Sequence, residues 1–395
     1  MLLFRRHRPN AKMVRSHSRR FSKLIVFAFL AACTRKPIDL TKVNAELLEA
    51  AQKGDTVSVQ RLLQNGAAIE AKDRGGSTPL GVAANYHHAD TAKLLLAKGA
   101  DPVAGGLAGE SALADAAIGS DSTRVALILE RGSDSKTSTN ALFAMSESRS
   151  LVVNEENQDI PVELAFPNDS EIVKLLVEHG ADIDARDEEE ATPLMRAAAF
   201  GQTGVVRALL DHGANAEAKD KSGNTALIAA GCACAIIDMP ETLPSMKLLL
   251  EKGADVNAKN KVGTTALMAA ASWGRAANIQ LLIGKGAKID AKDKDGNTAL
   301  LIAAAPGALP TADATELLLN SGANIEARNS QGDTALILAS KGGYEDARTV
   351  RLLLSRGADV SAKDTHGYTA LALALKNHRA AVAVLLKNAI AARQQ

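Results

Sequence analysis

Aromatic residues are scarce in this chain. Only 3% of its 395 residues are Phe, Tyr or Trp, although 46% are hydrophobic. The core must therefore be built from Ala, Leu, Ile and Val, and such small side chains suit thin, regularly stacked layers better than one large globular centre. The length alone would allow two or three compact domains. The composition favours one long repeat array.

Cysteine is also scarce, since three residues are too few for a disulfide framework. Cys232 and Cys234 stand two positions apart, and on a helix this separation directs two side chains to different faces. We interpret them as small residues standing where other repeats use Ala, because the sequence around them offers no further ligands for a metal or redox pair. We predict no metal and no cofactor.

Basic residues are not in excess once the first 32 residues are set aside. Residues 1–32 contain eight Lys or Arg and no acidic residue, so the rest of the chain has 38 basic and 45 acidic residues, a net charge of about −7. A phosphate-tracking protein needs a basic face. We therefore predict no nucleic-acid partner.

The N-terminal segment has the order of a secretory signal peptide. Basic residues are spread over residues 5–23, and residues 24–32 form a short apolar run that ends in small residues. Nine residues rise only about 14 Å as a helix, less than half the thickness of the hydrocarbon layer. The run is therefore too short to be an ordinary membrane span.

The sequence Leu30-Ala31-Ala32-Cys33 resembles the lipobox of bacterial lipoproteins. In that family the Cys thiol is alkylated with diacylglycerol, the chain is cut before the Cys, and the new amine is acylated. The resemblance implies that residues 1–32 are a lipoprotein-type signal peptide and that Cys33 becomes a lipidated N-terminus. Several acyl chains on one residue give stable anchoring.

Residues 33–43 would then be the anchor Cys and a linker. Thr34, rather than Asp, follows the Cys, and this favours the outer membrane over the inner membrane, with the chain facing the periplasm. Two alternatives stay open. Met13 instead of Met1 could be the start, and the apolar run could be a chance feature of a cytoplasmic protein.

The rest of the chain repeats one unit about ten times. Gly-Ala-Asp or a close variant recurs at spacings of 33, 33, 48, 33, 40, 33, 36 and 35 residues, which indicates a fixed unit with occasional insertions. Its Gly residues are Gly66, Gly99, Gly132, Gly180, Gly213, Gly253, Gly286, Gly322 and Gly357. A second marker, of the type Gly-x-Thr-Pro/Ala-Leu with Glu190 in place of Gly in one copy, supplies Thr78, Thr192, Thr225, Thr265, Thr298, Thr334 and Thr369.

These two markers and their period resemble the ankyrin repeat over residues 44–390. The resemblance implies an all-α ankyrin-repeat solenoid of about ten helix-turn-helix repeats with β-hairpin-like fingers, followed by a tail at residues 391–395. One feature of the family is missing. The His that follows Leu is replaced by Gly81, Met195, Ile228, Met268, Leu301, Ile337 and Ala372. The hydrogen bonds that this His makes between neighbouring loops must be absent or replaced, so we expect somewhat looser coupling between repeats.

Each marker has a physical role in the predicted unit. The Thr hydroxyl can cap the first helix, and Pro79 and Pro193 occupy the first helical position, where proline is tolerated. The second helix buries paired leucines such as Leu209-Leu210 and ends at the recurrent Gly, where a left-handed residue costs least. No unit buries its apolar side alone, so stability comes from its neighbours.

Insertions lengthen several units. Those near 234–244, 305–312 and 341–346 fall between first and second helices. The fourth repeat is harder to place. Because residues 160–165 resemble the start of a first helix, we predict an insertion at 135–159 in the finger region, with a short helix near Asn140–Ser146. The alternative starts that first helix at Thr139 and places the insertion between the two helices of the repeat.

The resemblance also implies that a protein partner binds the fingers and the first helices, which line a concave groove. Tyr86, Phe200 and Trp273 occupy one repeat position at the end of the first helix, and Tyr368 lies in a finger. We predict that these rings are exposed and form a contact row, since aromatic anchors dominate binding energy where they cluster. The alternative is that they only cover the edge of a neighbouring repeat.

The finger at residues 187–190 is acidic throughout. Glu188 and Glu189 would favour a basic surface on the partner, although a charge run is often only a solvated tip. Taken with the aromatic row, this gives six residues for a predicted partner site.

No catalytic constellation is visible in the sequence. The histidines are scattered over several repeats, and no nucleophile elbow or phosphate loop is present. We predict no enzyme activity and no small-molecule substrate, but a membrane-anchored, periplasm-facing scaffold that binds a protein. Two alternatives are a secreted or host-directed ankyrin effector without a lipid anchor, and a structural envelope protein that binds cell-wall material.

Overall fold

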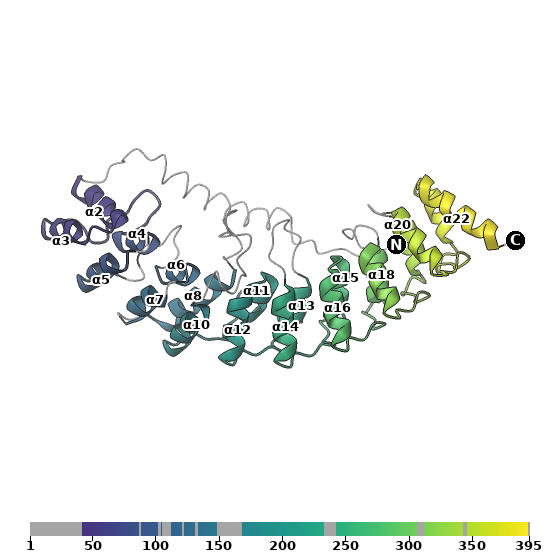
Figure 1. The fold of residues 1–395 in the computed structure, drawn as a ribbon, viewed down its shortest axis with the longest axis horizontal. Coiled ribbons are helices and arrows are strands. Elements are labelled where there is room, and N and C mark those ends of the chain that lie inside the picture. The colour runs from purple at the N-terminus through teal and green to yellow at the C-terminus, as the bar shows by residue number, and fades with distance from the viewer. Residues whose placement is uncertain are drawn as a thin grey trace. The chain divides into compact units, whose positions relative to one another are not determined.

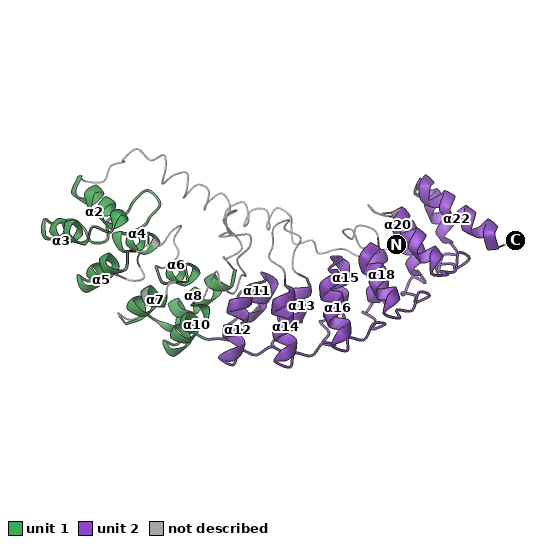
Figure 2. Cartoon of the chain, viewed as in Figure 1, with its two compact units in different colours: residues 1–182 green, residues 183–395 purple. Residues whose placement is uncertain are grey.

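The computed structural model describes residues 42–86, 88–101, 104, 112–120, 122–130, 133–147, 168–232, 242–305, 312–342 and 346–393. This part of the chain contains 20 helices and no strand, and an isolated antiparallel bridge joins Lys363 to Thr369. Figure 1 shows the helices, and Figure 2 shows the two compact units into which the chain divides, Met1–Asp182 and Ile183–Gln395. The prediction of an all-α ankyrin-type architecture is confirmed.

Among the described residues, the first unit contains four pairs of consecutive helices. Its first helices are α2 (Lys42–Lys53), α4 (Pro79–Asn85), α6 (Ala112–Ile118) and α8 (Ser135–Glu147). Its second helices are α3 (Thr56–Gln64), α5 (Ala89–Ala97), α7 (Ser122–Leu129) and α10 (Asp169–Glu178). Within the unit each first helix packs against the next first helix, and each second helix against the next second helix.

In its described part, the second unit contains six pairs built in the same way. Its first helices are α11 (Pro193–Ala199), α13 (Ala226–Gly231), α15 (Ala266–Ser272), α17 (Ala299–Ala304), α19 (Ala335–Ser340) and α21 (Ala370–Lys376). Its second helices are α12 (Thr203–Asp211), α14 (Leu243–Glu251), α16 (Ala276–Gly284), α18 (Ala312–Asn320), α20 (Asp346–Ser355) and α22 (Ala380–Arg393). Each helix contacts its counterpart in the next pair, so the core runs through the unit as a series of thin layers.

The predicted capping residues begin the first helices as expected. Thr265 Oγ1 accepts a hydrogen bond from Met268 N at 3.3 Å, and the other six marker threonines cap their helices through the corresponding amide. Pro79 and Pro193 lie in the first turn. The residue that replaces the family's His therefore still provides the backbone N–H that the Thr hydroxyl requires.

Small residues fill the first helices and branched residues fill the second. In α15 all residues from Ala266 to Ala271 are buried, which allows close approach of the neighbouring first helices. In α12 Val205, Val206 and Leu209 are buried, whereas Leu210 is half-buried. Of the pair Leu209-Leu210, one member therefore enters the core and the other lies at its edge, whereas both members of the pair Leu248-Leu249 are buried.

The second helices end where the recurrent Gly takes a left-handed conformation. Gly213 has φ +90° and Gly253 has φ +91°, and both follow a helix whose last turn is closed by backbone hydrogen bonds. A residue with a Cβ is strained at such a φ. The predicted role of these glycines is confirmed at each of the described positions of the series, which leaves out Gly132.

The fourth repeat differs from the arrangement that we favoured. Residues 135–147 form helix α8, which packs against α6 as a first helix does, while α10 packs against α7 as a second helix does. Ala141, Leu142 and Met145 of α8 are fully buried. The predicted insertion at 135–159 is therefore wrong at its start, and the alternative with the insertion between the two helices fits better, although the helix begins at Ser135 rather than Thr139. Residues 148–167 lie outside the described residues.

Both ends of the array extend further than predicted. Helix α2 begins at Lys42 and α22 continues to Arg393, whose guanidinium donates hydrogen bonds to the carbonyl oxygens of Gly357 (3.2 Å) and Ala358 (2.8 Å). Residues 391–393 are thus part of the last repeat rather than a tail. The cores of the other predicted insertions, at 233–241, 306–311 and 343–345, lie outside the described residues.

Candidate interaction surface

The described fingers of the second unit are tight turns, each held by the Asp or Asn that begins it. The turn ends at a Gly in all of them except the acidic finger, where Glu190 takes the left-handed position with φ +59°. In the finger before α13, Asp220 Oδ1 accepts hydrogen bonds from the backbone N–H groups of Ser222 and Asn224, both at 2.8 Å. Asp220 N donates to Asn224 O at 3.1 Å, and Gly223 has φ +80°. The carboxylate is therefore occupied inside its own turn, and the two residues between Asp220 and Gly223 form the tip.

Neighbouring tips in the second unit are joined by backbone hydrogen bonds. A backbone N–H in each tip donates to a carbonyl oxygen of the preceding tip over 2.8–2.9 Å, and this contact recurs five times. The donor–acceptor pairs are Lys221–Glu189, Lys261–Ser222, Lys294–Val262, Ser330–Asp295 and Thr365–Gln331. In the family, the His that is missing here makes hydrogen bonds between neighbouring loops. In this unit the five backbone hydrogen bonds, which we call the tip ladder, join the loops and need no particular side chain.

A row of lysine side chains runs along three adjacent fingers of this unit. We name residues 219–223, 259–263 and 292–296 the lysine fingers, because each has Lys on both sides of its Asp or Asn. Lys219 Nζ donates to the carbonyl oxygen of Lys259 at 3.3 Å, Lys259 Nζ to that of Lys292 at 2.7 Å, and Lys292 Nζ to that of Arg328 at 2.9 Å. These contacts hold each ammonium group at a defined place along the row.

The sequence analysis did not predict the lysine fingers, because it considered the net charge of the whole array, which is negative. The signal was nevertheless present as Lys-x-Lys at three successive repeats. All six lysines are exposed, and so is Val262 at the middle tip, with 57% of its surface accessible.

The acidic finger precedes the lysine fingers in the same unit. Asp187 is held in its turn by backbone amides and by Arg196, whose Nε lies 2.7 Å from Oδ2. Glu188 and Glu189 are exposed, and Arg196 also lies 3.6 Å from the carboxylate of Glu189. Lys221 Nζ donates to the backbone carbonyl of Glu188. The structure therefore presents both predicted glutamates to solvent, directly beside the first lysine finger.

The predicted aromatic residues share a repeat position, as expected, but not a common exposure. Tyr86, Phe200 and Trp273 each cap the C-terminal end of a first helix. Tyr86, in the first unit, is 38% exposed, and its hydroxyl lies 2.9 Å from Gln52 Nε2, whereas Phe200 and Trp273, in the second unit, are only half-buried. The prediction of an exposed ring therefore agrees with the structure at Tyr86 but is wrong at Phe200 and Trp273, whose rings are partly covered.

Tyr368 lies in the finger before α21. It is 40% exposed, and Lys376 Nζ lies 4.9 Å from the centre of its ring, within the range of a cation–π contact. Cys33, the predicted lipidation site, lies outside the described residues. In the part of the chain that the structure describes, no helix has the length and hydropathy of a membrane-crossing segment, and no cluster of side chains is suited to hold a metal ion.

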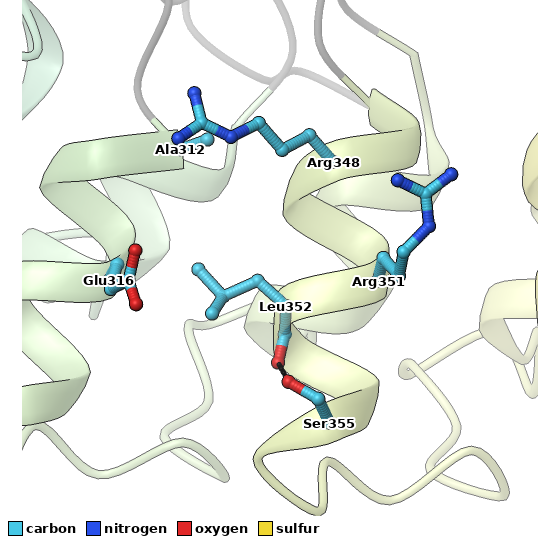
Figure 3. Close-up of a pocket in the computed structure, with 6 residues that line it drawn as sticks. All are labelled: Ala312, Glu316, Arg348, Arg351, Leu352 and Ser355. Carbon is cyan, nitrogen blue, oxygen red and sulfur yellow. Dashed lines mark hydrogen bonds between the residues drawn. The ribbon is translucent and has the colours of Figure 1, made fainter.

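Shallow grooves separate neighbouring second helices. The groove between α18 and α20, shown in Figure 3, has a volume of about 330 Å³. It is lined by Ala312, Glu316, Arg348, Arg351, Leu352 and Ser355. Arg348 pairs with Asp313 at 2.5 Å and Arg356 with Glu316 at 3.3 Å, so the charged groups at its rim join the two helices to each other.

Comparison with known proteins agrees with this geometry. A family model described as ankyrin repeats in three copies matches residues 47–139, 162–243, 232–329 and 308–395. A curated relative, the mouse 2-5A-dependent ribonuclease, is 47% identical over 60 residues, which are 15% of this chain and 8% of that protein. The chain therefore spans only a small part of that relative. Ankyrin repeats serve as scaffolds for protein–protein interaction rather than as catalytic domains, and this chain belongs to the ankyrin-repeat family.

Proposed function

We propose that the chain is a lipid-anchored scaffold of a bacterial cell envelope, which faces the periplasm and binds a protein partner through its fingers and first helices. The anchoring part rests on the sequence Leu30-Ala31-Ala32-Cys33, which follows a basic segment and a short apolar run. Eight residues, 34–41, separate Cys33 from helix α2. An anchor at Cys33 would keep the repeats close to the membrane surface.

The binding part rests on one structural observation. In the second unit the finger tips are joined to one another by backbone hydrogen bonds, and all of their side chains except the half-buried Gln331 are exposed. A surface that is rigid before binding loses little conformational entropy when a partner docks. The fingers therefore provide a pre-organised contact surface whose specificity depends on the residues at each tip.

Labelling with palmitate tests the anchor. In a Gram-negative host, the full chain should incorporate labelled palmitate and fractionate with the outer membrane. Cys33→Ser should lose the label and move to the soluble periplasmic fraction. If the label persists in Cys33→Ser, or if the unmodified chain is soluble or exported from the cell, the anchor is wrong and an effector without lipid becomes the better account.

Crosslinking of intact envelopes tests the scaffold. A C-terminally tagged full chain, crosslinked in the cell and purified under denaturing conditions, should carry a defined protein partner. Peptidoglycan in place of protein in the crosslinked product would contradict the proposed function and favour a structural envelope role.

A further inference from the structure

The lysine fingers concentrate positive charge on a chain that is acidic outside its N-terminal segment. Their fifteen residues contain six lysines and three acids, Asp220, Asp293 and Asp295, which leaves a net charge of +3. Asp220 Oδ1 and Asp293 Oδ1 accept backbone N–H groups of their own turns at 2.7–2.9 Å. The charges of Asp220 and Asp293 are thus directed towards their turns. The six exposed lysines outnumber the one exposed carboxylate, that of Asp295.

The ammonium groups are positioned before any partner arrives. Lys259 Nζ donates one hydrogen bond to the next finger, and Lys261 Nζ donates one to the carbonyl oxygen of Lys221 at 2.6 Å. An ammonium group has three N–H donors. Each of these lysines therefore keeps donors for an incoming acceptor at a place set by the repeat, without first having to order a flexible side chain.

An apolar side chain lies among these charges. Val262 occupies the tip of the middle lysine finger, next to Lys261, and its backbone carbonyl accepts the hydrogen bond from Lys294 N. Burial of an exposed Val is favourable wherever a partner covers it. The surface thus combines an apolar centre with a basic surround.

The tips of the neighbouring fingers differ from the lysine fingers. Glu188 and Glu189 form the preceding tip, and the uncharged Ser330 and Gln331 form the following one. The basic position before each turn continues as Arg186 and Arg328, which donate hydrogen bonds to the carbonyl oxygens of Lys219 and Lys363, both at 2.7 Å. A uniform polyanion that runs along the fingers would meet the acidic finger, and the lysine fingers contain no aromatic ring on which a base could stack. These features favour a short acidic protein segment over nucleic acid or an anionic membrane.

We propose that the lysine fingers bind an acidic, extended segment of the protein partner, with one apolar side chain of that segment placed on Val262. This proposal rests on the proposed scaffold function and names the chemistry of its partner. Three repeats that stack about 8–10 Å apart span about 20 Å, which an extended segment covers with roughly six or seven residues.

A fluorescence-anisotropy titration tests the proposal with the full chain in detergent. The probe is a labelled peptide of about ten residues in which glutamates flank one central leucine. We expect binding that weakens with added salt. The triple variant Lys221→Gln/Lys261→Gln/Lys294→Gln should raise the Kd about tenfold or more. Val262→Ser should weaken binding of this peptide but not of a matched peptide with Ser in place of the leucine.

A matched triple variant controls for net charge. Lys247, Lys285 and Lys387 are exposed lysines on or just after second helices, and their replacement by Gln should leave the Kd within about twofold. Equal losses in both triple variants, no binding of the peptide, or tighter binding of an oligothymidylate or of phosphatidylglycerol vesicles would each overturn the proposal. Circular dichroism of the Gln variants should match that of the parent chain.

The envelope crosslinking experiment separates this proposal from the scaffold function. If the partner is recovered equally well with the Lys221→Gln/Lys261→Gln/Lys294→Gln variant, the scaffold function stands and the lysine fingers are not its contact surface. A selective loss of that partner supports both.

Discussion

The side-chain amide of Asn329 donates a hydrogen bond of 3.2 Å to Oδ1 of Asn297, one finger earlier in the chain. Both side chains are buried, and Asn297 in turn donates to Asp293 Oδ2 at 3.1 Å. The same relay recurs from Asn260 to Asn224 (2.9 Å) and from Asn224 to Asp220 (2.9 Å). Two pairs of fingers are thus joined beneath their tips by amide groups.

The next pair of fingers lacks this relay because the donor position holds Asp364. Asp333, which corresponds to Asn297, is fully buried, and its Oδ1 has no hydrogen-bond partner, while Oδ2 pairs with Lys341 Nζ at 2.6 Å. An unsatisfied buried acceptor costs stability.

Asp364→Asn should therefore stabilise the protein. The introduced amide would keep the oxygen acceptor that holds its turn and would gain an N–H donor directed towards Asp333, as Asn329 has towards Asn297. We expect a gain of about 1 kcal/mol in the free energy of unfolding, measured by urea denaturation. A loss of stability would contradict the view that an amide at this position stabilises the contact between neighbouring fingers.

The closeness of neighbouring tips can be measured with two glycines. A Cβ at Gly223 would lie 2.8 Å from Lys261 N, whereas a Cβ at Gly213 would meet no atom within 4 Å, and both residues have a left-handed φ. Gly213→Ala should cost about 1–2 kcal/mol from backbone strain alone. Gly223→Ala should cost about 1–3 kcal/mol more, because the tips must move apart. Equal costs for the two variants would mean that the tips yield freely and that the tip ladder is weak.

Those features that recur in every unit were predictable from the sequence, and those that depend on one neighbour were not. Thr265 and Gly253 have the predicted roles because helix capping and a left-handed turn are local requirements. Helix α8 was misplaced because Ser135–Glu147 lacks the Thr-Pro-Leu marker and is held instead by burial of Leu142 and Met145 in the layer beside α6. The pairing of Asn260 with Asn224 has a counterpart in only some repeats, so the repeat period of the sequence does not predict it.

The same difference between recurring and neighbour-dependent features explains why the candidate site was predicted only in part. Repeat position alone placed Phe200 and Trp273 at the ends of first helices, but how much of each ring is covered depends on the adjacent repeats. The lysine fingers escaped detection because total charge averages over the whole chain, whereas a partner meets only the tips.

Acid should weaken the last repeat through Asp359. Hydrogen bonds from the side chain and backbone of Ser361, with a further contribution from Arg393, lower the pKa of Asp359 below its ordinary value of 3.8. A lowered folded-state pKa stabilises the protein above the unfolded value, and this contribution is lost as the pH falls below about 4. Asp359→Asn should therefore lose less stability between pH 5 and about pH 3 than the parent chain does. An identical loss in both proteins would exclude Asp359 as a source of the acid sensitivity.

Trp273→Ala tests whether the half-buried ring belongs to the partner site. We expect weaker capture of the crosslinked partner, because a large ring at the end of a first helix supplies contact area. Since part of the ring is covered, thermal unfolding should shift by only a few degrees. Phe200→Ala provides a matched variant at the same repeat position. Unchanged capture in both variants would remove the aromatic row from the site and leave these rings as covers of neighbouring repeats.

Site-specific photocrosslinking in intact cells tests the central claim most directly. A benzophenone amino acid placed at Val262, on a finger tip, should crosslink to a defined protein, whereas the same amino acid at Lys247, on second helix α14, should not. Crosslinks from Lys247 alone, or the same products from both positions, would contradict the claim that the fingers are the surface that binds the partner.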